Sequence, residues 1–312
     1  MIDGISFYLP GLSYDLFPGI TFEQKGNSEI TFMGRIRIQK GIGGLWISCS
    51  LGKMINGENI SPIDRHGVKR AIEEIEKTIN FDLHGIPLSS IEIGGSFIMD
   101  RPPPDYLHLF GLHSRYEKRP HIHPNFGLTG ILYVLEYSDY SFQIYNKSLE
   151  IKRKKQLVPE VYRNSHILRL ELKVKRKRGL EAWFGKEGKK KNLSPHDLYE
   201  QTIYKTLKEK FYNFYQGIEK LDKTFLFGCG LKGIVKPDEI KTLFAQLYYQ
   251  EDPDKCMGLI TNLKAAGNLT NNSLWRIKKM YQFPDSSTGY DSIDNPLIQE
   301  LDAKVLAAIE TD

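Results

Sequence analysis

Three separated segments of the sequence alternate between apolar and polar residues, and this alternation constrains the fold more than any other feature. The segments are residues 91–97, 142–147 and 168–173. In a β-strand, residues two apart lie on the same face, so each segment has one apolar side and one polar side. We therefore predict that they are strands of one antiparallel sheet whose apolar side is covered by helices.

The rest of the chain supplies further strands and then helices. Other β-rich segments lie at residues 5–9, 30–38, 45–51 and 129–137, and the segments at 142–147 and 168–173 belong to predicted strands over 141–147 and 166–174. Apolar residues at helical spacing predict one helix near residues 62–79 and a long one from about residue 198. Shorter helices are expected from about residues 237, 255, 273 and 296. The fold class is thus α+β, with a sheet domain at 1–228 and a small helical C-terminal module at 229–312.

Composition excludes several classes of protein. Hydrophobic residues make up 40% and charged residues 26%, which is typical of a globular protein. The sequence contains no apolar run near the roughly 20 residues that cross a bilayer and no secretory signal, so we expect a cytoplasmic protein without a membrane partner. The odd set of Cys49, Cys229 and Cys256 excludes a disulfide framework. The phosphate-loop motif of ATPases and helicases is absent.

Positive charge is concentrated in one segment. Residues 152–191 contain 15 Lys and Arg against 4 Asp and Glu, a net charge of +11, so the remainder of the +5 chain carries −6. A solvated surface loop is the simple explanation, but the concentration favours a contact with a phosphate backbone. The candidate DNA-binding residues are Lys152, Arg153, Lys154, Lys155, Arg169, Lys173, Lys175, Arg176, Lys177 and Arg178.

The polar sides of the three strands carry a phenol, carboxylates and cations. Glu92 lies on the first strand, Tyr145 and Lys147 on the second, and Arg169 and Glu171 on the third. Carboxylates on a rigid sheet suit Mg²⁺ or Mn²⁺, and a tyrosine beside such a cation can attack a phosphodiester. The alternative is an ordinary half-exposed sheet whose charges form cross-strand ion pairs.

Four motifs in fixed order extend this interpretation. They are Met1-Ile2-Asp3, Ser90-Ile91-Glu92, the Tyr-x-Lys-x-x-Glu run at residues 145–150, and Leu168-Arg169-Leu170-Glu171 followed by Gly179-Leu180. Over about residues 1–220, the chain resembles the gene II/X replication proteins of filamentous phages. It is similar in the same way to the related rolling-circle replication initiators of plasmids, which are tyrosine nickases related to HUH endonucleases.

The resemblance implies a DNA nicking and joining enzyme. Tyr145 would attack the phosphate and stay joined to the 5′ end, with Lys147 as its partner. Glu92, Glu150 and Glu171 would hold Mg²⁺ or Mn²⁺. Alternation along a strand places Glu150 on the face opposite Tyr145, so Glu150 is a ligand only if the chain turns after Lys147. His121 and His123 match the histidine pair that the larger family uses for its metal, and they form the rival metal site.

The resemblance also defines the expected partners. They are origin DNA, single-stranded or in a hairpin at the nick site, together with a host helicase and a second copy of the chain. Two alternatives stay open. The same basic sheet fits a non-catalytic binder of single-stranded nucleic acid, and the same chemistry fits a conjugative relaxase.

Overall fold

The protein is described here in a computed structural model, which defines residues 1–11, 21–107, 109–113, 121–126, 130–156, 158–184, 192–220, 223–226 and 291–311. The described chain divides into two units, one of Met1–Asp222 with Asn295–Asp312 and the other of Lys223–Asp294. Every helix among the described residues is too short or too polar to cross a lipid bilayer.

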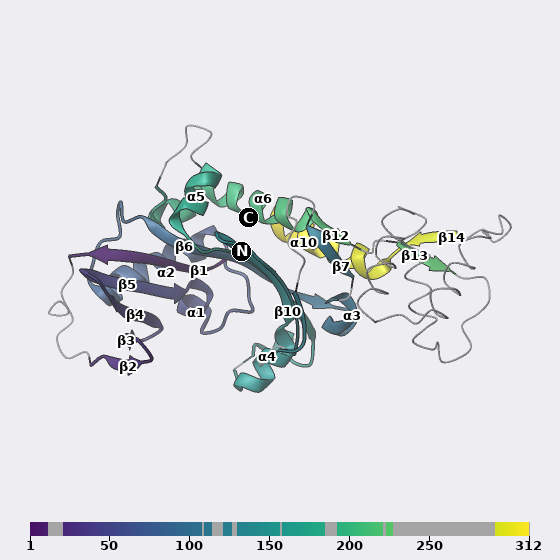
Figure 1. The fold of residues 1–312 in the computed structure, drawn as a ribbon, viewed down its shortest axis with the longest axis horizontal. Helices are drawn as coiled ribbons and strands as arrows, with labels where there is room; N and C mark the ends of the chain where they lie inside the picture. Colours follow the sequence, from purple (N-terminus) through teal and green to yellow (C-terminus); the bar gives the residue numbers. More distant parts are fainter. Residues whose placement is uncertain are drawn as a thin grey trace, which may run out of the picture. The chain divides into compact units, whose positions relative to one another are not determined.

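The described strands belong to three sheets, and the largest dominates the first unit (Figure 1). In chain order the strands are β1 (Ile2–Pro10), β2 (Glu23–Lys25), β3 (Ser28–Met33), β4 (Ile36–Gly41), β5 (Gly44–Ser50), β6 (Leu88–Met99), β7 (Phe110–His113), β8 (His121–Phe126), β9 (Gly130–Glu136), β10 (Tyr140–Asn146), β11 (His166–Val174), β12 (Ile218–Lys220), β13 (Lys223–Leu226) and β14 (Asp291–Asp294). Ten described strands form the large sheet in the order β2-β3-β4-β5-β1-β6-β11-β10-β9-β8. All its neighbouring strands run antiparallel, as predicted.

Seven α-helices and two short 3₁₀ segments fall in the described residues. They are α1 (Leu51–Asn56), α2 (Arg65–Ile79), α3 (Pro103–Leu107), α4 (Lys147–Lys154), η2 (Glu160–Tyr162), α5 (Lys177–Phe184), η4 (Pro195–Tyr199), α6 (Gln201–Gln216) and α10 (Pro296–Glu310). The predicted α+β class is therefore confirmed. The helices expected from about residues 237, 255 and 273 lie outside the described residues.

The core lies on the apolar face of the large sheet. Leu168, Leu170 and Leu172 of β11 are fully buried there, and so are Phe142 and Ile144 of β10. Helices α2, α5, α6 and α10 add their apolar stripes to the same core. Burial of that face leaves the opposite face of β11, β10 and β6 for polar side chains, as the alternation predicts.

Helix α2 illustrates how the sequence defines an element. Asp64 caps it by accepting a hydrogen bond from the Gly67 amide at 2.6 Å, and the predicted stripe from Val68 to Ile79 is buried. The helix begins at Arg65, a turn later than the expected start near Ser61-Pro62. An Asp side chain satisfies an otherwise unpaired amide of the first turn, which defines the start of the helix.

Three other predictions differ from the structure. Residues 30–38 form two strands, because β3 ends at Met33 and the chain turns at Gly34, which has a left-handed φ of 58°. The residues between the predicted strands at 91–97 and 129–137, for which we predict no helix or strand, include α3, β7 and β8. Helix α10 is present, but it packs against β6 and α6 within the first unit rather than in a C-terminal module (Figure 1).

Candidate functional site

The three polar strand faces predicted from the sequence lie side by side. Strand β11 is hydrogen-bonded to β10 on one side and to β6 on the other. In one row across the strands Tyr145 is opposite Arg169, which is opposite Ser96. Glu171 lies one pleat along β11 from Arg169, and Lys173 is opposite Glu92. Residues at the same cross-strand position share a face, so these side chains form one polar platform.

Three carboxylates meet on this platform. One oxygen from each of Asp3, Glu92 and Glu171 lies within 4.8 Å of the other two. Asp3 is buried and the two glutamates are half-buried. Three hard oxygen donors at this spacing are a ligand set that suits Mg²⁺ or Mn²⁺. We call these residues the carboxylate cluster.

The negative charges of the cluster affect the pKa of Glu92. Burial, followed by repulsion from Glu171 and Asp3, raises the pKa of Glu92 to about 7. Lys173, whose Nζ lies 3.7 Å from the Glu92 carboxylate, only partly offsets this repulsion. A divalent cation is favourable beside a carboxyl of this kind, because the cation takes the place of the proton that the Glu92 carboxyl otherwise retains.

This electrostatic conflict predicts how stability depends on pH. In EDTA, the melting temperature of the protein should fall as the pH rises from 5 to 8, because the Glu92 carboxyl loses its proton at about pH 7 in the folded chain and near pH 4.5 when unfolded. The fall should be on the order of 5 °C, smaller in Glu92→Gln, and reversed at pH 8 by Mg²⁺ or Mn²⁺.

Differential scanning fluorimetry checks this expectation. The matched control is Glu136→Gln, which removes an exposed carboxylate on β9 that pairs with Lys175. If the melting temperature of Glu92→Gln falls with pH as steeply as those of wild type and the control, ionisation of Glu92 does not destabilise the folded protein.

Asp3 was missed by the sequence analysis as a cluster member. Strict alternation along β1 places Asp3 with the buried residues Ile5 and Phe7. The pairing of β1 with β6 shifts register between Ile2 and Gly4, however. An irregularity of this kind changes the direction of the side chain within it, which here is Asp3. The Asp3-Gly4 pair inside a strand was the available signal, since glycine within a strand often marks a bulge.

Arg169 holds two of the carboxylates in place. Its guanidinium donates to Glu171 Oε1 at 2.9 Å and to an Asp3 oxygen on its other side. It also donates to Ser96 Oγ at 2.9 Å and to the backbone oxygen of Asn59 at 3.2 Å. Arg169 is only 3% exposed, so it is an internal organiser of the cluster and not the DNA contact that we predicted. Burial lowers the pKa of Arg169, but Asp3 and Glu171 outweigh burial and raise it.

Tyr145 reaches the carboxylate cluster directly. Its hydroxyl donates to Glu171 Oε1 at 2.8 Å, and its ring packs against Val134 of β9. Burial, followed by the negative charge of Glu171, raises the pKa of Tyr145 well above its usual value. The phenol is therefore protonated at neutral pH, and its proton already points at a carboxylate that can accept it.

Lys147 and Glu150 form a separate pair beside the tyrosine. Asn146 caps α4, so the chain turns into a helix at Lys147. Lys147 is buried, and its Nζ donates to Glu150 Oε2 at 2.7 Å and to Asn59 Oδ1 at 3.0 Å. The Lys147 Nζ lies 5.9 Å from the centre of the Tyr145 ring. Burial, then the charge of Arg169, lowers the pKa of Lys147.

Glu150 is not a member of the carboxylate cluster in the described residues. The helical spacing of three and four residues directs its carboxylate to Lys147 and Lys154 instead. The chain does turn after Lys147, as the assignment of Glu150 required, but the turn leads to an ion-paired position. The third carboxylate of the cluster, predicted to be that of Glu150, is that of Asp3.

His121 and His123 lie on β8 at the end of the strand order. Their register with β9 pairs them with Val134 and Leu132, and Leu132 is in turn paired with Tyr145. Their side chains lie outside the described residues, so the assignment of this pair to a metal stays a prediction.

A second ligand-like group is formed by Asp82, His84 and His196. Both ring nitrogens of His196 already have partners, because Nε2 lies 2.7 Å from Glu76 Oε1 and Nδ1 lies 2.7 Å from the Tyr199 hydroxyl. This group connects the loop after α2 to η4, and we assign it a structural role.

The predicted basic residues other than Arg169 lie at or near the surface. Lys152, Arg153, Lys154 and Lys155 are exposed at the end of α4, and Lys173, Arg176, Lys177 and Arg178 are also exposed; Lys175 is half-buried. Several form surface ion pairs, such as Lys175 with Glu136 and Arg178 with Asp139. Exposed pairs of this kind are weak, so a polyanion can compete for the cations.

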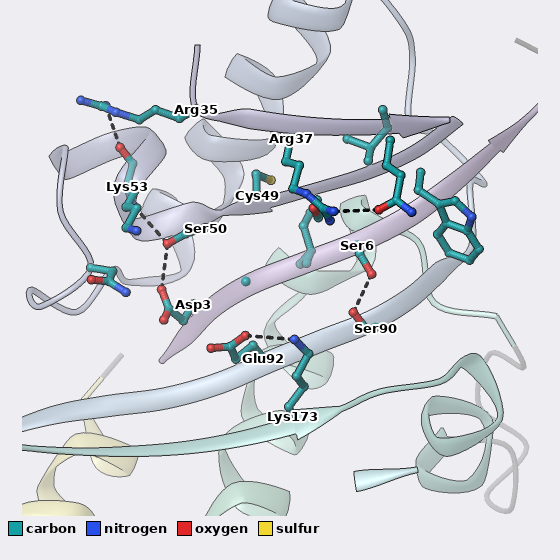
Figure 2. Close-up of a pocket in the computed structure, with 17 residues that line it drawn as sticks. Asp3, Ser6, Arg35, Arg37, Cys49, Ser50, Lys53, Ser90, Glu92 and Lys173 are labelled. Carbon is teal, nitrogen blue, oxygen red and sulfur yellow. Dashed lines mark hydrogen bonds and ion pairs between the residues drawn. The ribbon is translucent and has the colours of Figure 1, made fainter. Parts of the chain in front are cut away.

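A pocket of about 540 Å³ adjoins the carboxylate cluster. Figure 2 shows Asp3 and Glu92 on adjacent strands at one end of it, with Arg37 farther along the sheet. The lining comes from β1, β4, β5 and β6, together with Arg35 just before β4, Lys53 of α1, Asn59 and Lys173 of β11. Arg35, Arg37 and Lys53 are cations of this pocket that the sequence analysis did not single out.

The chain was compared with protein families, curated proteins and solved structures. No family model and no curated protein matches the chain. Among solved structures, the chain is similar to a rolling-circle replication initiator protein from Geobacillus stearothermophilus. The two share 12% sequence identity with a TM-score of 0.37, over 74% of this chain and 89% of that one.

Proposed function

We propose that this protein is a DNA nicking and joining enzyme that initiates rolling-circle replication, using Tyr145 as its nucleophile and Mg²⁺ or Mn²⁺ as its cofactor. The observation that carries the proposal is the hydrogen bond of 2.8 Å from the Tyr145 hydroxyl to Glu171, a member of the carboxylate cluster. A phenol in contact with a set of carboxylates that suits a divalent metal ion is an arrangement that favours attack of the phenol on a phosphodiester. The motifs shared with phage and plasmid initiators support the same assignment.

The residues of the chain divide the work of the reaction. Asp3, Glu92 and Glu171 would hold the cation. When bound, the cation supplies positive charge that polarises the scissile phosphate and makes ionisation of Tyr145 easier. Arg169 keeps Asp3 and Glu171 in place. Lys147, held by Glu150 and Asn59 beside the ring, adds positive charge near the forming phenolate.

The covalent step transfers one bond to the protein. The Tyr145 hydroxyl oxygen bonds to phosphorus and its proton passes to Glu171, while the bond from phosphorus to the 3′ oxygen breaks. The departing 3′ oxygen takes a proton from water and becomes a 3′-hydroxyl, and the hydroxide that remains takes the proton from Glu171, so that water and the carboxylate are both restored. Because the phosphodiester becomes a phosphotyrosine ester, a later 3′-hydroxyl can reverse the step and join the strand without an external energy source.

The basic surface supplies the affinity for DNA. Its exposed cations extend from the end of α4 to the start of α5 and contact phosphates without reading sequence. Arg169 lies in the same basic segment of the sequence but is buried, so its role differs from that of the exposed cations. The charge of Arg169 serves the carboxylates, and the charges around it in sequence serve the DNA.

Detection of the covalent intermediate tests the proposal. The protein is incubated with Mn²⁺ and single-stranded fragments tiled across the replicon from which its gene comes, and the mixture is digested with trypsin and nuclease. Mass spectrometry should find a nucleotide attached to the peptide that contains Tyr145. An adduct on a different residue, or binding of the fragments without any adduct, contradicts the proposal.

A further inference from the structure

The pocket beside the carboxylate cluster continues the polar platform across the sheet. One row of paired residues runs from Ser90 on β6 through Ser6 and Ser48 to Arg37 on β4. The pocket shares Asp3 and Glu92 with the cluster, so the two sites are contiguous (Figure 2). Its volume of about 540 Å³ is in the range of pockets that bind small organic ligands.

The lining of the pocket suits a nucleotide. Arg35, Arg37, Lys53 and Lys173 provide positive charge, and the carboxylates among the lining residues are those of Asp3 and Glu92, which belong to the cluster. Serine hydroxyls and Asn59 offer neutral hydrogen-bonding groups between these charges. Cations with neutral donors bind phosphates and sugars, whereas the two acidic residues at one end are suited to a metal ion.

Trp46 gives the pocket an aromatic surface. Its side chain is 42% exposed, and its ring centre lies 5.0 Å from that of Tyr8. The β4–β5 hairpin holds this pair closely, because a Cβ on Gly41 would lie 3.0 Å from the Trp46 ring and one on Gly44 would lie 2.7 Å from the Tyr8 hydroxyl. An exposed indole with a fixed position is a stacking surface for an unpaired base.

The order of residues across the sheet gives the pocket a direction. From β10 to β1 the strands carry Tyr145, Glu171, Glu92 and Asp3 in turn, and the pocket lies beyond them over β1, β5 and β4. In phosphoryl transfer, the attacking and leaving oxygens lie roughly in line on opposite sides of phosphorus. With Tyr145 attacking from the β10 side, the 3′ oxygen leaves toward the pocket.

We infer that this pocket binds the nucleotides immediately upstream of the nick, those that end in the released 3′-hydroxyl. The inference rests on the proposed function, because it takes Tyr145 as the group that becomes joined to the 5′ end. Arg37 contacts a phosphate of this segment, and Trp46 stacks on one of its bases. Retention of the segment keeps the 3′-hydroxyl beside the phosphotyrosine, where it can rejoin the strand.

Binding measurements test the pocket without any nicking. Fluorescence anisotropy with 5′-fluorescein-labelled (dT)₈ should show about 10-fold weaker binding for Arg37→Ala and for Trp46→Ala. The matched control is Arg70→Ala, which removes the same charge from the exposed side of α2, a helix that packs on the opposite face of the sheet. Its affinity should stay within about twofold of wild type. Equal affinities for wild type and both pocket variants would overturn the inference.

Photochemical cross-linking tests the direction. Oligonucleotides that span the mapped nick site carry 5-iodouracil one nucleotide upstream or one nucleotide downstream of it, and they are irradiated with Tyr145→Phe protein. The upstream probe should label the peptide that contains Trp46, and the downstream probe should not. Labelling by the downstream probe alone overturns the direction. If wild type forms no adduct at all, the proposed function fails, and the inferred direction fails with it, while the (dT)₈ result still decides whether the pocket binds nucleotides.

Discussion

A Tyr145→Phe variant should form no covalent adduct with single-stranded DNA and should nick it at least about 10⁴-fold more slowly than wild type. The substitution removes one oxygen atom, the one that donates to Glu171 and that we propose attacks phosphorus. The hydroxyl that donates to Glu171 is then lost, and hydrolysis by water in its place leaves no bond between the DNA and the protein. Nicking and adduct formation are read on the same denaturing gel, with the DNA and the protein labelled separately.

The structure offers a close control for this variant. Tyr140 lies on the same strand, and its hydroxyl donates to the backbone oxygen of Gly179 at 3.1 Å, away from the carboxylate cluster. Tyr140→Phe should therefore lose about 1 kcal/mol of stability, as Tyr145→Phe does, and keep its nicking rate within a few-fold. Both variants should bind single-stranded DNA as wild type does. Nicking by Tyr145→Phe at the wild-type rate would remove Tyr145 from the mechanism.

The platform could be predicted because its geometry follows from the period of a strand. Alternation in three segments placed Glu92, Tyr145 and Glu171 on polar faces, and burial of the leucines of β11 forces those faces to one side of the sheet. The order of the strands is not contained in the alternation. It follows from long-range pairing, which brings residues far apart in the chain into adjacent strands.

Asp3, Glu150 and Arg169 show where local patterns stop being informative. A shift in pairing between β1 and β6 brings Asp3 into the cluster, and a shift of this kind depends on both strands together. The sequence motif is compatible with a turn after Lys147, but the partners of Glu150 depend on the direction in which α4 points its carboxylate. Arg169 resembles its basic neighbours in the sequence, and only the carboxylates packed around it distinguish its role.

The membership of Asp3 in the cluster leads to a second large effect. Asp3→Asn should weaken Mn²⁺ binding by at least about 10-fold and slow nicking by about 100-fold. Asparagine keeps the size of the side chain and an oxygen that can accept from Arg169, so the loss is mainly that of one negative charge among the three ligands. Titration of free Mn²⁺ by electron paramagnetic resonance measures the affinity directly, whether or not DNA is cleaved.

Glu150→Gln is the matched control for Asp3→Asn. It removes the same charge from the residue that the sequence motif assigns to the metal and that the structure pairs with Lys147 and Lys154. If the cluster binds the ion, Glu150→Gln changes Mn²⁺ affinity by less than about twofold, even where nicking slows through the altered position of Lys147. The opposite result, with Mn²⁺ affinity kept in Asp3→Asn and lost in Glu150→Gln, would mean that the ion binds beside α4. Asp3 would then serve only as an ion-pair partner of Arg169.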